Sequence, residues 1–259
     1  MANSASGDSV VDRVVRLIAA FPEGVTVLQL SELADRAGLP LTTAHRLVRQ
    51  LAHHGLLEAG AGGSVRLGLR LWELVNRNSP TLALRQAAMP FMEDIQHVLN
   101  QNVNLAVLDG WEALFVERLS RRGSVANRAQ IAGRMAVHVS SAGLALMSHQ
   151  PRSVQAEYLD QFADPAGKVT AEDLRALLGE AARQGYAQLA GVIDPDTWGI
   201  AVPVLDGQKR AVAALGVVVP LREMRMQALV PALQTAARGI GRRLTESAAG
   251  TDFRSMESL

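Results

Sequence analysis

The residues best suited to binding chemistry in the first third of the chain are polar side chains on one face of a helix predicted over 42–54. Arginine can donate two hydrogen bonds to the edge of a guanine, and threonine, histidine and glutamine suit base edges or phosphate oxygens. Arg46 and Arg49 lie one helical turn apart, so both can face the same groove of a DNA duplex. The expected DNA-contacting residues on this face are Thr42, Thr43, His45, Arg46, Arg49 and Gln50, and His53 belongs to the same outward row of donors.

Two further helices and a hairpin are predicted to position this face. Apolar residues at three- and four-residue steps indicate helices over 8–20 and over about 29–37, and Ser31 and Thr42 are the expected caps of the second and third helices. A glycine-rich turn then joins two short strands, with Arg66 on the second one. This order predicts a winged helix-turn-helix in which the helix over 42–54 enters the major groove, with Arg66 on the wing.

The overall charge excludes a polycation that coats nucleic acid or membrane. The chain contains 26 Lys plus Arg and 25 Asp plus Glu, which gives a net charge of +1. Between residues 41 and 70, however, four arginines stand against the single acidic residue Glu58, a local charge of +3. A polar face on a short helix is usually only a solvated surface, so the order of the elements supports DNA binding more strongly than the face does.

The 259-residue chain has no cysteine, which excludes disulfides, thiolate metal sites and a cysteine nucleophile. Its hydrophobic content of 48% is typical of globular proteins in solution. No apolar run is long enough for a signal peptide or a spanning helix. The six histidines also lack the spacing of a helical metal site. We therefore expect a cytoplasmic protein without a metal or other cofactor.

The remainder of the chain predicts an α+β domain, because strand pairs precede and follow a group of helices. The strand pairs flank the turns Asp109-Gly110 and Asp206-Gly207, and Thr170 with Asp173 has the pattern of a capping box. The strands are expected over 103–108, 113–119, 199–205 and 212–219, and the helices over 140–149, 153–162, 170–184 and 225–244.

The changes of pattern suggest four parts. The winged helix-turn-helix is expected over 8–70 and a helical linker over 71–101, broken at Ser79-Pro80. The α+β domain is expected over 102–246, and a polar, flexible tail over 247–259.

Two groups of residues could indicate an enzyme. Asp194 and Asp196 pair two carboxylates, but the proline between them indicates a turn. His138 lies close in sequence to Ser140 and Ser141, yet no Gly-x-Ser-x-Gly motif surrounds these serines, and Ser140 fits a helix N-cap. We therefore expect no catalytic residues.

Four arginines between the predicted strands could form an anion site, although a solvated strand edge or a subunit contact explains them better. They are Arg121, Arg122, Arg128 and Arg134.

Several segments share their order and spacing with one family. Residues 27–40, 42–51 and 65–68 are similar to the DNA-binding half of IclR-type bacterial transcriptional regulators. Residues 105–110, 138–143, 183–186 and 200–207 are similar to the effector-binding domain of the same family, and the resemblance covers about 9–244. It implies a GAF-like C-terminal domain that binds a small molecule and supports dimers and tetramers.

The resemblance also implies the position of a pocket. Ala142 and Gly143 match a helix start where main-chain N–H groups approach the ligand in the family, a favourable place for a carboxylate. Family members that bind small carboxylic acids have polar residues at positions that are Leu189, Ala190, Gly199, Gly216 and Val218 here. Since none of these is polar, we expect a small aromatic or hydrophobic acid or amide as the effector. The expected effector-binding residues are Ala142, Gly143, Leu105, Met135, Leu189, Trp198, Gly199, Gly216 and Val218, and further apolar candidates are Val107, Phe115, Val202, Leu215 and Val217.

Together these inferences predict a ligand-responsive, DNA-binding repressor of a catabolic operon. A two-fold assembly, a dimer or tetramer, would bind a pseudo-palindromic operator, and the effector would alter the spacing of paired DNA-binding domains. The alternative is a module for small-molecule sensing and protein interaction without regulated DNA binding. Neither hypothesis involves a membrane partner.

Overall fold

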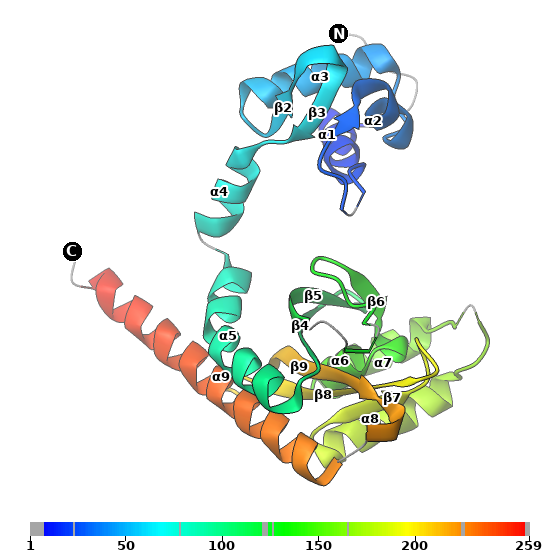
Figure 1. Cartoon of the computed structure of the whole chain (residues 1–259), viewed down its shortest axis with the longest axis vertical. Helices are drawn as coiled ribbons and strands as arrows, with labels where there is room; N and C mark the ends of the chain where they lie inside the picture. Colours follow the sequence, from blue (N-terminus) through cyan, green and yellow to red (C-terminus); the bar gives the residue numbers. More distant parts are fainter. Residues whose placement is uncertain are drawn as a thin grey trace. The chain divides into compact units, whose positions relative to one another are not determined.

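The computed structural model describes residues 8–22, 24–77, 79–120, 124–125, 127–164, 166–223 and 226–256, with the backbone alone at 223, 226–227 and 247–256. The chain divides into two compact units, Met1–Ser79 and Pro80–Leu259 (Figure 1). No helix in the described part of the chain is long and apolar enough to cross a membrane.

The N-terminal unit is a winged helix-turn-helix, as the sequence predicts. Leu17, Leu33, Leu47 and Leu57 are buried in one apolar core that joins the helices to a small sheet. The helices are α1 (Val10–Ala19), α2 (Leu30–Arg36), α3 (Leu41–His53) and α4 (Leu69–Arg77). The antiparallel sheet has the order β1-β3-β2 and consists of β1 (Leu28–Gln29), β2 (Leu57–Ala59) and β3 (Ser64–Leu67), with the short helix η1 (Ala61–Gly63) at the turn.

The helix starts differ from those expected. Ser31 and Thr42 lie inside α2 and α3, whose N-caps are Gln29 and Pro40, so the predicted caps are wrong. Proline has no N–H to satisfy, and its fixed φ suits the residue from which a helix departs, which places the start of α3 one residue earlier. The side-chain cap in this unit is at α1, where Ser9 accepts from the backbone N–H of Asp12 at 3.1 Å.

The C-terminal unit is built on a six-stranded antiparallel sheet of order β6-β5-β4-β9-β8-β7. Two of its strands, β6 and β7, are short edge strands that the sequence did not predict. The strands are β4 (Asn102–Asp109), β5 (Glu112–Leu119), β6 (Arg134–Ala136), β7 (Ala187–Ala190), β8 (Thr197–Leu205) and β9 (Ala211–Pro220). The helices are α5 (Pro80–Leu99), η2 (Val137–Val139), α6 (Ser141–Met147), α7 (Arg152–Gln161), α8 (Ala171–Gln184), η3 (Leu221–Glu223) and α9 (Met226–Met256).

Helices cover both faces of this sheet. In Figure 1, α5 and α9 lie side by side against one face, and α6, α7 and α8 lie against the other. Successive residues of a strand point to opposite faces, so each inner strand contributes to two apolar cores. In β8, Ile200 packs in the core with α5 and α9, whereas its neighbour Ala201 packs in the core with α6. This sheet with helices on both faces is consistent with a GAF-like α+β domain.

The last helix extends beyond the limit expected from sequence, and a proline lies inside an earlier one. The last helix, α9, continues to Met256 rather than ending near Leu244, since the segment 245–256 contains no proline to end it. Pro90 lies inside α5 without ending it. Of the two helices predicted around Ser79-Pro80, α4 belongs to the N-terminal unit, and α5 packs on α9 in the C-terminal unit.

Two glycines of α8 provide a matched pair for a stability measurement. A methyl group at Gly179, in the exposed middle of the helix, would meet no atom within 4 Å, whereas Gly185 ends the helix at φ +72°. We expect Gly179→Ala to raise the free energy of unfolding by about 0.5–1 kcal/mol, because alanine loses less backbone entropy than glycine in a helix. Gly185→Ala should lower it, and thermal denaturation of both variants would test this. Equal changes in the two variants would contradict the expectation.

Candidate nucleic-acid interface and ligand pocket

The polar face of α3 is exposed because the opposite face forms part of the N-terminal core. Leu47, Val48 and Leu51 are buried against the other helices and the sheet. Of the residues expected to contact DNA, Thr43 is half-buried, and the structure places the others on the exposed side of α3, namely Thr42, His45, Arg46, Arg49 and Gln50.

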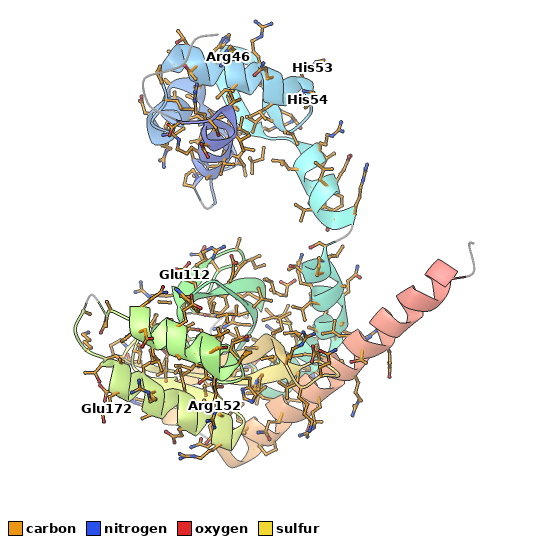
Figure 2. All side chains as sticks on the ribbon, turned by 180° about the vertical axis from the view of Figure 1, so that it is seen from behind. Arg46, His53, His54, Glu112, Arg152 and Glu172 are labelled. Atoms are coloured by element: carbon orange, nitrogen blue, oxygen red, sulfur yellow. The ribbon has the colours of Figure 1, made fainter. Side chains whose placement is uncertain are left out.

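Arg46 and Arg49 have no ion pair or hydrogen bond with any residue that the structure describes. Their guanidinium groups are therefore available to a ligand. Figure 2 shows Arg46 and His53 on α3 and His54 at its C-cap, and the rings of the two histidines meet edge to face at 5.2 Å between centroids. A shallow hollow brings these histidines together with His45, Arg46, Arg49 and Gln50. His53 belongs to the outward row expected from sequence, whereas His54 does not, although its position at the end of the same basic helix could have indicated it.

The wing arginine is less available. Arg66 of β3 pairs with Glu58 of β2, directly opposite in the sheet, and its Nε donates to Glu58 Oε2 at 2.7 Å. The carboxylate neutralises Arg66, so the net local charge of +3 comes from Arg46, Arg49 and Arg70 rather than from the wing. Both side chains are well exposed, where such pairs stabilise by only about 0–1 kcal/mol. A phosphate could therefore replace Glu58 as the partner of Arg66.

The C-terminal unit contains a pocket of about 590 Å³, its open mouth included, between the sheet and the start of α6. Two glycines on neighbouring strands create its floor. Gly216 of β9 lies opposite Asn104 of β4, and Gly199 of β8 lies between Val218 and Leu189. A Cβ atom at Gly199 would come within 3.0 Å of Ser141 Oγ, so a larger residue there would fill the space under α6.

Six of the nine expected effector-binding residues line this pocket and three do not. Leu105 and Trp198 pack instead in the core with α5 and α9, because their side chains point to the other face of the sheet. Gly143 is buried behind the lining, where its N–H donates to Ser140 Oγ at 3.3 Å. The residues in the lining are Ala142, Met135, Leu189, Gly199, Gly216 and Val218, joined by the further candidates Phe115 and Val217, whereas Val107, Val202 and Leu215 pack with α5 and α9.

Polar residues that the sequence analysis did not select also line the pocket. One signal was present, because Asn102 and Asn104 are alternate polar residues in an otherwise apolar strand and must therefore share a face. The lining is thus mixed rather than wholly apolar. Its polar members are Asn104, Asn127, Arg128, Ser140, Ser141, Asp194 and Thr197.

Of the four arginines considered as one anion site, the structure describes two, Arg128 and Arg134, and these have different surroundings. Arg121 and Arg122 lie outside the described residues. Arg134 pairs with Asp109 and Glu112, an environment that raises its pKa through the hydrogen bond to Asp109 above all. Arg128 alone lines the pocket, where it is the one cation among the described lining residues.

The residues considered for catalysis have structural partners. His138 Nε2 lies 3.8 Å from Asp164 Oδ1, and the ring of His138 meets Phe162 edge to face. Backbone N–H groups, that of Ala166 first, lower the pKa of Asp164. Burial raises the pKa of Tyr158, which also packs on Phe162, to about 12.

The remaining catalytic candidates are likewise structural. Asp194 Oδ1 accepts from the backbone N–H of Asp196 at 3.1 Å, as in a turn. Ser140 caps α6, as expected from the sequence. Within the described part of the chain, no three His, Asp or Glu side chains could hold a metal ion together.

Comparisons with known proteins agree with this architecture. Residues 79–242 match the family model described as bacterial transcriptional regulator IclR C-terminal, and residues 10–60 match that of the IclR helix-turn-helix domain. The HTH-type transcriptional regulator XynR of Escherichia coli is 26% identical over 210 residues, 79% of this chain and 83% of that protein. KipR of Bacillus subtilis, named likewise, is 27% identical over 224 residues, 84% of this chain and 90% of that protein. These relatives are named as regulators rather than enzymes, in agreement with the expectation from sequence.

One solved structure bears on the pocket. It is the crystal structure of an IclR homologue from Microbacterium hydrocarbonoxydans in complex with 4-hydroxybenzoate. That chain is 43% identical to this one, with a TM-score of 0.85, and the match covers 91% of this chain and 99% of that one.

Proposed function

Because the chain belongs to the IclR family of bacterial transcriptional regulators, we propose that it is a cytoplasmic repressor that a small aromatic acid releases from its operator. The observation that carries the DNA-binding part is a pair of exposed arginines, Arg46 and Arg49, on the second helix of a helix-turn-helix. Neither has a partner among the described residues. The proposed DNA contacts are Thr42, Thr43, His45, Arg46, Arg49 and Gln50 on α3 and Arg66 on the wing.

An aromatic acid is the effector class that the pocket favours. Phe115, Met135 and Leu189 offer apolar surface for a ring above the glycine floor, and Arg128 supplies positive charge for a carboxylate. The 4-hydroxybenzoate in the 43% identical homologue supports the same class. We assign the regulated genes to a catabolic operon, as expected from the sequence. The proposed contacts are Met135, Ala142, Leu189, Gly199, Gly216 and Val218, with Arg128 added.

The regulation is a linkage between two sites. An effector changes operator affinity only to the extent that it binds one arrangement of the assembly more tightly than the other. A dimer or tetramer with two-fold symmetry would place two copies of α3 on successive turns of the duplex and would read a pseudo-palindromic operator. The aromatic acid is then expected to favour the arrangement whose α3 spacing does not fit the operator.

A titration of the full chain tests both halves of this proposal. We expect 4-hydroxybenzoate to bind more tightly than glyoxylate in isothermal calorimetry and to weaken binding to the DNA upstream of the protein's own gene in a gel-shift assay. Tighter binding of glyoxylate would contradict the aromatic effector. Ligand binding without any sequence-preferring DNA binding would instead favour a sensing and interaction module.

A further inference from the structure

Asn104 is a buried asparagine in the pocket. Within the described residues, only one end of its side-chain amide forms a hydrogen bond. It lies on β4 opposite Gly216 and is 5% exposed. Its Oδ1 accepts a hydrogen bond from Asn127 Nδ2 at 2.9 Å. Its own Nδ2 has no acceptor among the residues that the structure describes, and the side chain lines the pocket. Asn104 Nδ2 is not one of the fully buried, unpaired polar atoms of the described residues, so its accessible surface lies in the pocket. An oxygen atom of a ligand there can accept a hydrogen bond from it.

The direction of the amide follows from a backbone group. The N–H of Ala129 donates to Asn127 Oδ1 at 3.0 Å. Because a backbone N–H can only donate, the oxygen of Asn127 must face Ala129, which leaves its nitrogen to face Asn104. Asn104 must then turn its oxygen to Asn127 and its NH₂ group to the pocket. At this point of the pocket, Asn104 therefore presents a hydrogen-bond donor, Nδ2, rather than an acceptor.

Asn102 shows what a purely structural asparagine looks like on the same face of the same strand. It is 1% exposed, its Nδ2 donates to Val125 O at 2.8 Å, and its Oδ1 accepts from Ser124 Oγ at 3.1 Å. Both ends of Asn102 thus hold the segment that follows β5 onto β4. Asn104 contacts the same segment through its Oδ1 alone, which leaves its Nδ2 to bind a ligand.

We propose that Asn104 is a specificity-determining residue that donates, through Nδ2, to a neutral ring oxygen of the aromatic acid. This inference rests on the proposed function, because it needs an aromatic acid in the pocket. The pocket's cation, Arg128, is exposed to solvent, whereas Asn104 is buried. Burying a carboxylate costs far more than burying a hydroxyl group, so the carboxylate belongs with Arg128 and the hydroxyl with Asn104. The effector class is therefore a hydroxybenzoate rather than an unsubstituted benzoate.

The test compares two ligands within each protein, using the full chain and calorimetry. In the wild type, we expect the tighter of 3- and 4-hydroxybenzoate to bind about 10-fold more tightly than benzoate, because its oxygen accepts from the pocket-facing donor. In Asn104→Leu, this ratio should fall to about 1. Partial unfolding would affect both ligands equally, so it leaves the ratio unchanged. Asn102→Leu is the matched control, in which the ratio should stay at the wild-type value.

A second variant separates recognition from folding. Asn104→Asp keeps an oxygen facing Asn127 and replaces only the donor that faces the pocket. We expect at least a 10-fold loss of hydroxybenzoate affinity, with operator binding in the absence of ligand unchanged. A wild type that binds benzoate and both hydroxybenzoates equally would overturn the role of Asn104 and leave the aromatic effector in place. A wild type that binds none of them would overturn both the role and the effector class.

Discussion

Arg46→Ala is expected to weaken binding to operator DNA by about 10–100-fold and to relax the preference for one base pair in each half-site, with a similar loss for Arg49→Ala. A bidentate arginine–guanine contact contributes about 1–3 kcal/mol of discrimination, which corresponds to this range. Neither guanidinium is held by another described residue, so its loss removes a DNA contact without breaking an internal one. Gel-shift titrations against the operator and against single-base variants would measure both effects.

Arg152→Ala provides the matched control, since it removes the same charge from an exposed position on α7 of the C-terminal unit (Figure 2). It should leave operator affinity and base preference unchanged. If Arg46→Ala and Arg49→Ala both retain full affinity and preference, then α3 is not the recognition helix.

The second large effect is expected at Gly68, which lies between β3 and α4. A Cβ atom there would fall 2.0 Å from the backbone oxygen of Gly55, and the Gly68 N–H already donates to Leu56 O at 2.9 Å. Because the position of a Cβ atom is set by its own backbone and the atom that it meets is also backbone, no change of rotamer can relieve the clash. We expect Gly68→Ala to destabilise the N-terminal unit by about 3 kcal/mol or more and to abolish operator binding.

The change at Gly68 should spare the C-terminal unit, which has its own cores. Chemical denaturation would report the loss of stability, and binding of 4-hydroxybenzoate should persist. Gly62→Ala at the wing is the control, because a methyl group there meets no atom within 4 Å and only the positive φ is unfavourable, by about 1 kcal/mol. If Gly68→Ala is as stable as the wild type, the prediction is wrong, and the backbone segments at Gly55 and Gly68 can separate to accept the methyl group.

The sequence predicts the N-terminal unit well because the information there is local. Buried residues recur at helical spacing in α3, so the exposed arginines on its other face follow directly. The expected caps were wrong at α2 and α3 because several nearby residues could serve, whereas the capping box at Thr170 was confirmed by its two reciprocal hydrogen bonds with Asp173. The pairing of Arg66 with Glu58 depends on strand register, which the glycine-rich turn left open.

By itself, then, the sequence determined the family, the winged helix-turn-helix and the exposed face of α3, since each depends on neighbours within one or two turns of chain. Only the tertiary structure decided which residues share the pocket. Both faces of β8 and β9 are covered by helices and apolar, so no alternation in the sequence distinguishes Gly199 from Trp198. The same holds for Asn104, whose pocket-facing donor depends on Asn127 in a segment that folds back onto β4. Contacts between residues far apart in the chain leave little local pattern, and the ligand chemistry of this protein depends on such contacts.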